Sequence, residues 1–250
     1  MAGSEGAYVY GVVRGSATPP AGGGVDEQAV RLAGNGELAA LVSTAPSVPV
    51  KASRRNLMAH SRVLQEAMSA GPVLPMRFGV VMPSEEAVTA ELLDLHEPVL
   101  REQLGAFEDK VELELKVLCP EDELLRTVVA EQTEIRDRRE RLRGRPDEAT
   151  YYERIRLGEL VAGAVAAKRE QIAERAVSAL EPLAVAVRAD EPAADQVLAS
   201  AAFLVERDRL RDFDAAVDRL GEDLGSPVLV KCVGPLPAYH FVDLGAEAWA

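Results

Sequence analysis

The sequence contains few residues that could build a metal centre or a redox site. It has only two cysteines and three histidines in 250 residues, and none of them has the spacing of a zinc site. Cys119 and Cys232 lie in or at the end of apolar, strand-like segments, where a reduced cysteine acts as a small buried hydrophobe. We therefore expect no metal and no disulfide.

Long apolar runs are also missing. Nowhere do about 18 consecutive apolar residues occur, which excludes a transmembrane helix. The N-terminus lacks the basic segment and apolar core of a signal peptide. These two absences predict a cytoplasmic protein that does not enter a membrane.

Aromatic residues make up only 4% of the chain, so aliphatic side chains must form most of its core. With 48% hydrophobic and 28% charged residues, the composition is that of a folded globular protein. The net charge of −13 repels polyanions over most of the surface. The densest basic run, residues 136–145, is interleaved with acids and indicates a solvated helix end. We expect no nucleic-acid partner.

Motifs that carry catalysis are absent as well. The chain has no G-x-x-x-x-G-K-[ST] phosphate loop and no G-x-S-x-G nucleophile elbow. Acidic pairs such as Glu85-Glu86 stand at predicted helix starts, where carboxylates favour the helix dipole. His60 lies on the apolar face of a predicted helix, which is typical of a hydrogen-bonded core imidazole. The sequence predicts neither an enzyme nor a cofactor.

Hydrophobic periodicity predicts two α+β domains. In the first, residues 1–106, alternation and β-branched residues indicate strands, and spacings of three and four indicate helices. Pro75 makes one of these strands an edge strand or an irregular strand end. The predicted elements are strands at 7–14, 37–43 and 73–81, and helices at 53–70 and about 84–105.

The second predicted domain, residues 107–250, has the βαββαβ order of a ferredoxin-like unit. Its first helical connection is enlarged and covers about residues 120–180, with a break at residues 144–146 (Gly-Arg-Pro). In its first strand, Val111 and Leu113 fall on a buried face, and Glu112 and Glu114 on a wet one. The predicted strands are 107–118, 183–189, 196–206 and 227–233, and a helix covers 208–224.

Two segments are unusual for their surroundings. In Leu74–Gly79 (LPMRFG), Arg77 stands between Met76 and Phe78, where a cation needs a partner. Its stem either runs along apolar surface to a local carboxylate, or its charge serves a contact. In Gly234–Val242 (GPLPAYHFV), Pro235 and Pro237 hold an extended backbone that places Tyr239 and Phe241 on one face. This segment is either a stiff connector or a contact surface.

Four segments in order resemble the gas vesicle accessory protein family GvpL/GvpF. They are AYVYGVV (7–13), LPMRFG (74–79), YYERIRLGEL (151–160) and GPLPAYHFV (234–242), and the resemblance extends from about Tyr8 to Val242. It implies a cytoplasmic protein required to form gas-filled, protein-shelled buoyancy organelles, with a ferredoxin-like C-terminal domain. The family has no established catalytic residues. His240 departs from it, because relatives tend to carry a small polar residue there.

The resemblance also implies partners. They are the small hydrophobic shell protein of the vesicle and other gas vesicle accessory proteins, which the chain meets as an assembly factor or as a minor structural component. We expect a monomer in isolation, and the hypothesis for the shell contact is the edge with Arg77 and Phe78, or the surface with Pro235, Pro237, Tyr239 and Phe241. The alternative is a ligand-binding regulator or enzyme on a ferredoxin-like scaffold. A deep polar pocket at Arg77 or His60 would favour that alternative.

Overall fold

The computed structural model describes residues 6–34, 36–45, 49–192 and 194–243. The chain divides into one unit of residues 1–112 and 234–250 and a second unit of residues 113–233. The predicted division after residue 106 places the whole C-terminal region in the second domain, whereas the contacts group Gly234 onward with the N-terminal unit. Residues 1–5 and 244–250 of the predicted domains lie outside the described residues.

The first unit is built on an antiparallel sheet whose strands differ in length. The central strand β1 is buried along most of its length, as its run of Tyr and Val predicts, and it pairs with β3 throughout. The sheet order is β2-β3-β1-β4, and β5 also pairs with β1. The strands are β1 (Gly6–Arg14), β2 (Arg31–Gly34), β3 (Leu38–Ala45), β4 (Leu74–Pro75) and β5 (Val81–Met82), and a single 3-10 turn covers Val25–Glu27.

The predicted strand at 73–81 is interrupted in the structure. Only its ends pair with β1, as β4 and β5, and the backbone between them turns around Gly79 at φ +95°. A residue with a side chain is strained at that angle, so glycine is the residue that permits this turn. β4 lies at the end of the sheet order, which agrees with the edge position that Pro75 predicts.

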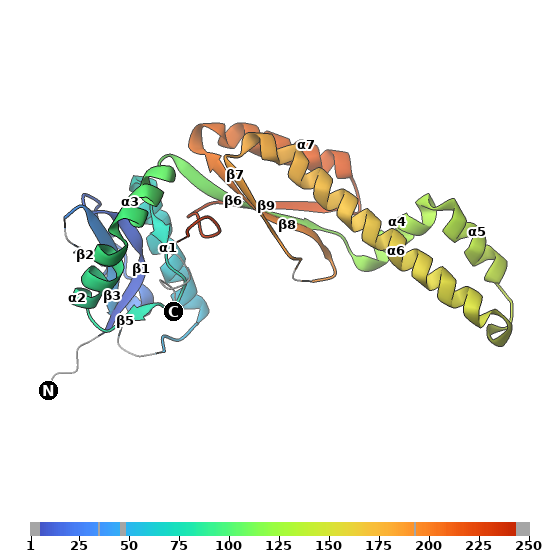
Figure 1. Cartoon of the computed structure of the whole chain (residues 1–250), viewed down its shortest axis with the longest axis horizontal. Helices are drawn as coiled ribbons and strands as arrows, with labels where there is room; N and C mark the ends of the chain where they lie inside the picture. Colours follow the sequence, from blue (N-terminus) through green and yellow to red (C-terminus); the bar gives the residue numbers. More distant parts are fainter. Residues whose placement is uncertain (1–5, 35, 46–48, 193, 244–250) are drawn as a thin grey trace. The chain divides into compact units, whose positions relative to one another are not determined.

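Two helical segments of the first unit begin at serine caps. The helix α1 (Arg54–Ala70) starts where the Ser53 hydroxyl accepts the N–H of Asn56 at 3.2 Å. The predicted cap Ser84 likewise accepts the N–H of Ala87 at 3.2 Å. The chain then continues as α2 (Glu85–Ala87), a π-helical segment (Val88–Asp94) and α3 (Leu95–Ala106) (Figure 1).

The second unit contains one sheet of order β7-β8-β6-β9, so β7 and β9 are its edge strands. Its elements follow the order that the sequence predicts, and the chain turns after Leu142, next to the break predicted at residues 144–146. It also turns after Glu131, which the sequence did not predict, so the first helical connection consists of three helices. The elements are β6 (Lys110–Leu118), α4 (Glu121–Glu131), α5 (Thr133–Leu142), α6 (Asp147–Leu180), β7 (Ala186–Asp190), β8 (Val197–Glu206), α7 (Leu210–Leu224) and β9 (Leu229–Leu236), with single 3-10 turns at Glu181–Leu183 and Arg207–Arg209.

The core of the second unit lies between the sheet and two helices. The C-terminal half of α6 and the helix α7 bury their apolar stripes against β6 and β8, and the rings of Phe203 and Phe213 meet edge to face at 5.3 Å. The N-terminal half of α6 continues past the sheet with α4 and α5 beside it (Figure 1). Across the described ranges, no helix combines the length and the apolar character needed to cross a membrane.

Candidate functional site

The LPMRFG segment lies against an aromatic cluster of the first unit. The Phe78 ring contacts the rings of Tyr8 and His60, with centroids 5.9 and 5.8 Å away. The backbone N–H of Met76 is bonded to the Tyr10 carbonyl at 2.8 Å, which holds the start of the turn. Arg77 points to solvent from this turn, and no ion pair joins it to another described residue. Within the described residues, the carboxylate partner that one of the two interpretations required is therefore missing.

A chain of hydrogen bonds fixes the imidazole of His60. The Met76 carbonyl can only accept, so His60 Nε2 carries the proton and donates to it at 3.1 Å. His60 Nδ1 then accepts from the Tyr8 hydroxyl at 2.9 Å, and the Tyr8 oxygen accepts the Gly79 N–H at 3.2 Å. The predicted core imidazole is confirmed. Because both ring nitrogens have partners, His60 is not free to bind a metal or a substrate.

Burial keeps this cluster electrically neutral. His60 is only 3% exposed, and burial lowers its pKa to about 4 from an ordinary value of 6.5. Burial also raises the pKa of the Tyr8 phenol. Tyr10 has its pKa raised by burial too, and its hydroxyl bonds to Ser43 Oγ at 2.8 Å and accepts the Val25 N–H at 2.7 Å. The cluster therefore consists of uncharged, fully paired groups at pH 7.

The C-terminal segment is extended only in part. The strand β9 ends at Leu236, and after it the N–H groups of Phe241 and Val242 both bond to the Ala238 carbonyl, at 3.1 and 3.2 Å. The predicted extended backbone through Phe241, with Tyr239 and Phe241 on one face, is therefore wrong beyond Leu236. The physical reason is that these amide groups are satisfied within a turn rather than by a neighbouring strand.

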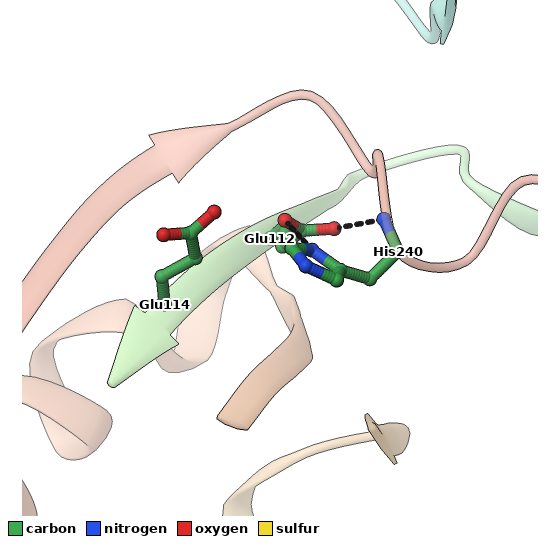
Figure 2. A group of neighbouring side chains, drawn as sticks. All are labelled: Glu112, Glu114 and His240. Atoms are coloured by element: carbon green, nitrogen blue, oxygen red, sulfur yellow. Dashed lines mark hydrogen bonds and ion pairs between the residues drawn. The ribbon is translucent and has the colours of Figure 1, made fainter. Parts of the chain in front are cut away.

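A buried carboxylate holds this turn. Glu112 is fully buried, and its Oε2 accepts the backbone N–H of His240 at 2.8 Å while its Oε1 bonds to His240 Nδ1 at 2.7 Å (Figure 2). Nearby, the Asp243 N–H donates to Gln103 Oε1 at 2.9 Å. The sequence places Glu112 on the wet face of its strand, and for this residue the expectation is wrong. The carboxylate is buried because the C-terminal segment folds onto it.

The two predicted contact segments share one neighbour, Tyr8. The pKa of Tyr8 is raised mainly by burial, and the phenol of Tyr239 adds to the shift. Burial, followed by the charge of Glu112, raises the pKa of Tyr239 to about 12. Tyr8 also contacts Phe78, with ring centroids 5.9 Å apart.

The predicted contact residues differ in how accessible they are. Arg77 and Pro235 are exposed, whereas Phe78, Tyr239 and Phe241 are half-buried and Pro237 is buried. Of these six residues, Arg77 and Pro235 are therefore the most accessible to solvent.

Comparisons with known proteins identify the family. The family described as gas vesicle synthesis protein GvpL/GvpF matches residues 6–243. Gas vesicle protein F of Streptomyces sp. (strain CB03234) is 41% identical over 240 residues, which are 94% of this chain and 99% of that relative. Gas vesicle protein F of Dolichospermum flosaquae is 26% identical over 223 residues, covering 88% of this chain and 90% of the relative.

A solved structure agrees with these matches. The crystal structure of the gas vesicle protein GvpF from Anabaena sp. PCC7120 is similar with a TM-score of 0.83 at 26% identity, and the match covers 95% of this chain and 98% of that one. The resemblance that the four sequence segments carry is thereby confirmed. The chain belongs to the gas vesicle synthesis protein GvpL/GvpF family.

Proposed function

We propose that this chain is an accessory protein needed for gas vesicle formation and that it binds the small hydrophobic shell protein. The family match over residues 6–243 supports a role in gas vesicles. In this proposal the chain works in the cytoplasm at the growing vesicle, as an assembly factor or a minor structural component, together with other accessory proteins.

The physical need for such a protein follows from the shell itself. A wall that excludes water from a gas space requires very apolar, β-rich subunits, and such subunits aggregate before they assemble. A carrier with a net charge of −13 would keep a bound subunit dispersed by charge repulsion. It must also offer an apolar surface or an unpaired strand edge to the subunit.

The single observation that carries the proposal is the edge strand β9. It lies at one end of its sheet and exposes two aliphatic side chains on the same face, Leu229 at 52% and Val233 at 54%. Its end carries Pro235, and Lys231 stands between the two aliphatic residues. Proline and lysine on an edge strand discourage open-ended pairing between copies, so this edge suits a single, different partner.

The first unit supplies the second proposed contact, at Arg77. This guanidinium projects from a turn that Phe78 anchors in the aromatic cluster, so the charge is presented from a rigid base. We assign Arg77 and Pro235 to direct contact. Phe78, Pro237, Tyr239 and Phe241 would act by holding the two contact segments in place.

Co-expression with the shell protein tests the proposal. The unmodified chain should raise the soluble fraction of the shell protein and co-purify with it. The substitutions Val233→Asp and Arg77→Glu should each lower the co-purified amount roughly fivefold, as expected for losing about 1 kcal/mol of binding. The matched control is Leu95→Asp, a side chain that is 70% exposed on α3 and should leave the yield unchanged.

Two further measurements complete this test. Deletion of the protein followed by microscopy should show cells without vesicles. Probing washed vesicles with an antibody distinguishes a minor component, which stays bound, from a transient assembly factor, which is removed. If the unmodified chain neither raises the soluble fraction nor co-purifies, the proposed binding of the shell protein is wrong.

A ferredoxin-like assignment of the second unit is also part of this proposal. It is supported by the element order β6, α4–α6, β7, β8, α7, β9 and by the sheet order β7-β8-β6-β9. Such scaffolds host enzymes and ligand-binding regulators as well. The binding protein is favoured here because the ring nitrogens of His60 are already paired and Arg77 faces solvent.

A further inference from the structure

We propose that a groove between α5 and α6 binds an acidic segment of a partner protein. The groove has a volume of about 540 Å³ and lies entirely within the second unit. Four arginines line it: Arg136, Arg139 and Arg143 from α5 and its end, and Arg154 from α6. This site shares no residue with the contacts proposed for the shell protein, which lie on β9 and at Arg77.

Two of these arginines have no ionic partner among the described residues. Within α5, the carboxylate of Glu134 is already paired with Arg138, at 2.8 Å. Arg136 and Arg139 form no ion pair with any residue in the described ranges; the Arg136 guanidinium only reaches the Thr133 hydroxyl at 3.5 Å. The basic run is therefore more than a helix end whose charges cancel, because two guanidinium groups remain available at the groove.

The other two arginines form ion pairs at exposed positions, and Arg154 also donates to Thr150 Oγ1 at 3.0 Å and to the Arg145 carbonyl at 3.4 Å. Arg143 pairs with Glu140, the one carboxylate of the groove lining, at 3.5 Å, and Arg154 pairs with Asp147 at 2.9 Å. All four of these side chains are well exposed, and ion pairs at exposed positions contribute little. A carboxylate of a partner can therefore replace Glu140 or Asp147 at small cost.

The spacing of the arginines suits a row of carboxylates. Residues three and seven positions apart lie on one face of a helix, so Arg136, Arg139 and Arg143 follow one another over about 10 Å. Each guanidinium can bind a carboxylate through two parallel hydrogen bonds. Leu157, which is half-buried, also lines the groove and provides apolar surface for an aliphatic side chain, and Leu142, only 6% exposed, lies beneath it. The site thus fits a segment with two or three acidic residues and at least one aliphatic residue.

Charge complementarity also decides against a nucleic acid. The chain as a whole carries −13, so most of its surface repels a long polyanion even where the arginines attract it. A short acidic segment avoids that repulsion. The YYERIRLGEL motif supplies Arg154 and Leu157 to the groove, which gives this family segment a role beyond helix formation.

Fluorescence anisotropy tests this proposal with the full chain. The probe is a labelled peptide of alternating glutamate and leucine, and its match is the same peptide with glutamine in place of glutamate. Only the acidic peptide should bind, and its affinity should fall with added salt because the contacts are exposed charges. The double variant Arg136→Gln/Arg139→Gln should bind at least tenfold more weakly. The double variant Arg136→Lys/Arg139→Lys keeps the charge but loses the planar guanidinium groups. Its affinity for the acidic peptide should lie between that of the unmodified chain and that of the glutamine variant.

The control is Arg188→Gln/Arg219→Gln, which removes the same charge from two other exposed arginines that form no ion pair within the described part of the chain. It should bind the acidic peptide like the unmodified chain. Equal losses in both double variants would overturn the proposal, because they would show a general charge effect. It would also be overturned if inorganic phosphate or a single-stranded oligonucleotide bound the groove more tightly than the peptide. Self-association that depends on Arg136 and Arg139 would assign the groove to a second copy of this chain instead.

Discussion

Acidification from about pH 7 to pH 4 is expected to cost the first unit about 3 kcal/mol of unfolding free energy through His60 alone. The unfolded chain binds a proton at His60 below its ordinary pKa of 6.5, whereas burial holds the pKa of the folded state at about 4. Between these two values the proton favours the unfolded state. The contribution of His60 is therefore complete above pH 6.5 and decreases as the pH falls towards 4.

Urea unfolding followed by far-ultraviolet circular dichroism across this pH range measures the effect. The substitution His60→Leu should remove this part of the pH dependence, and it should also lower stability at neutral pH by about 1–3 kcal/mol, because the Tyr8 hydroxyl and the Met76 carbonyl lose their partner. The matched control Tyr8→Phe keeps the buried imidazole and should keep the pH dependence. An unchanged slope in His60→Leu would show that another group causes the acid sensitivity.

Removal of the buried carboxylate by Glu112→Ala is expected to destabilise the first unit by about 3 kcal/mol. Glu112 accepts two hydrogen bonds from His240, one from the backbone and one from the ring. Its side chain is fully buried, so water does not reach the carboxylate. Without the carboxylate, the His240 N–H remains in the folded turn without its acceptor. The C-terminal segment should then detach from the unit more often.

The substitution His240→Ser is the control for this experiment. It removes the ring bond to Glu112 but keeps the backbone N–H, so its cost should be smaller, about 1 kcal/mol. Urea unfolding gives the two free energies, and limited proteolysis reports how readily the segment from Gly234 onward is cut. Glu112→Ala should increase the cleavage rate more than His240→Ser. Equal effects of the two substitutions would mean that the backbone bond contributes nothing.

The elements with strong local patterns were predictable. The apolar stripe of α7 and the alternation of β6 are patterns among residues only a few positions apart in the sequence. The Ser84 cap is also local, because the N–H that it accepts belongs to Ala87. The position of His60 on an apolar helix face likewise indicated its burial. The short strand β2 carries too few residues for a pattern, and the sequence did not indicate it.

The sequence alone determined the types and order of most elements, the family, and the presence of two unusual segments. Only the tertiary structure decided that Glu112 is buried, that Gly234 onward groups with the first unit, and that Arg136 and Arg139 line a groove without an ion pair to any other described residue. The reason is physical. Periodicity reports neighbours within one helix or strand, whereas His240 and Glu112 are 128 positions apart, and the choice of such a partner depends on how the whole chain packs.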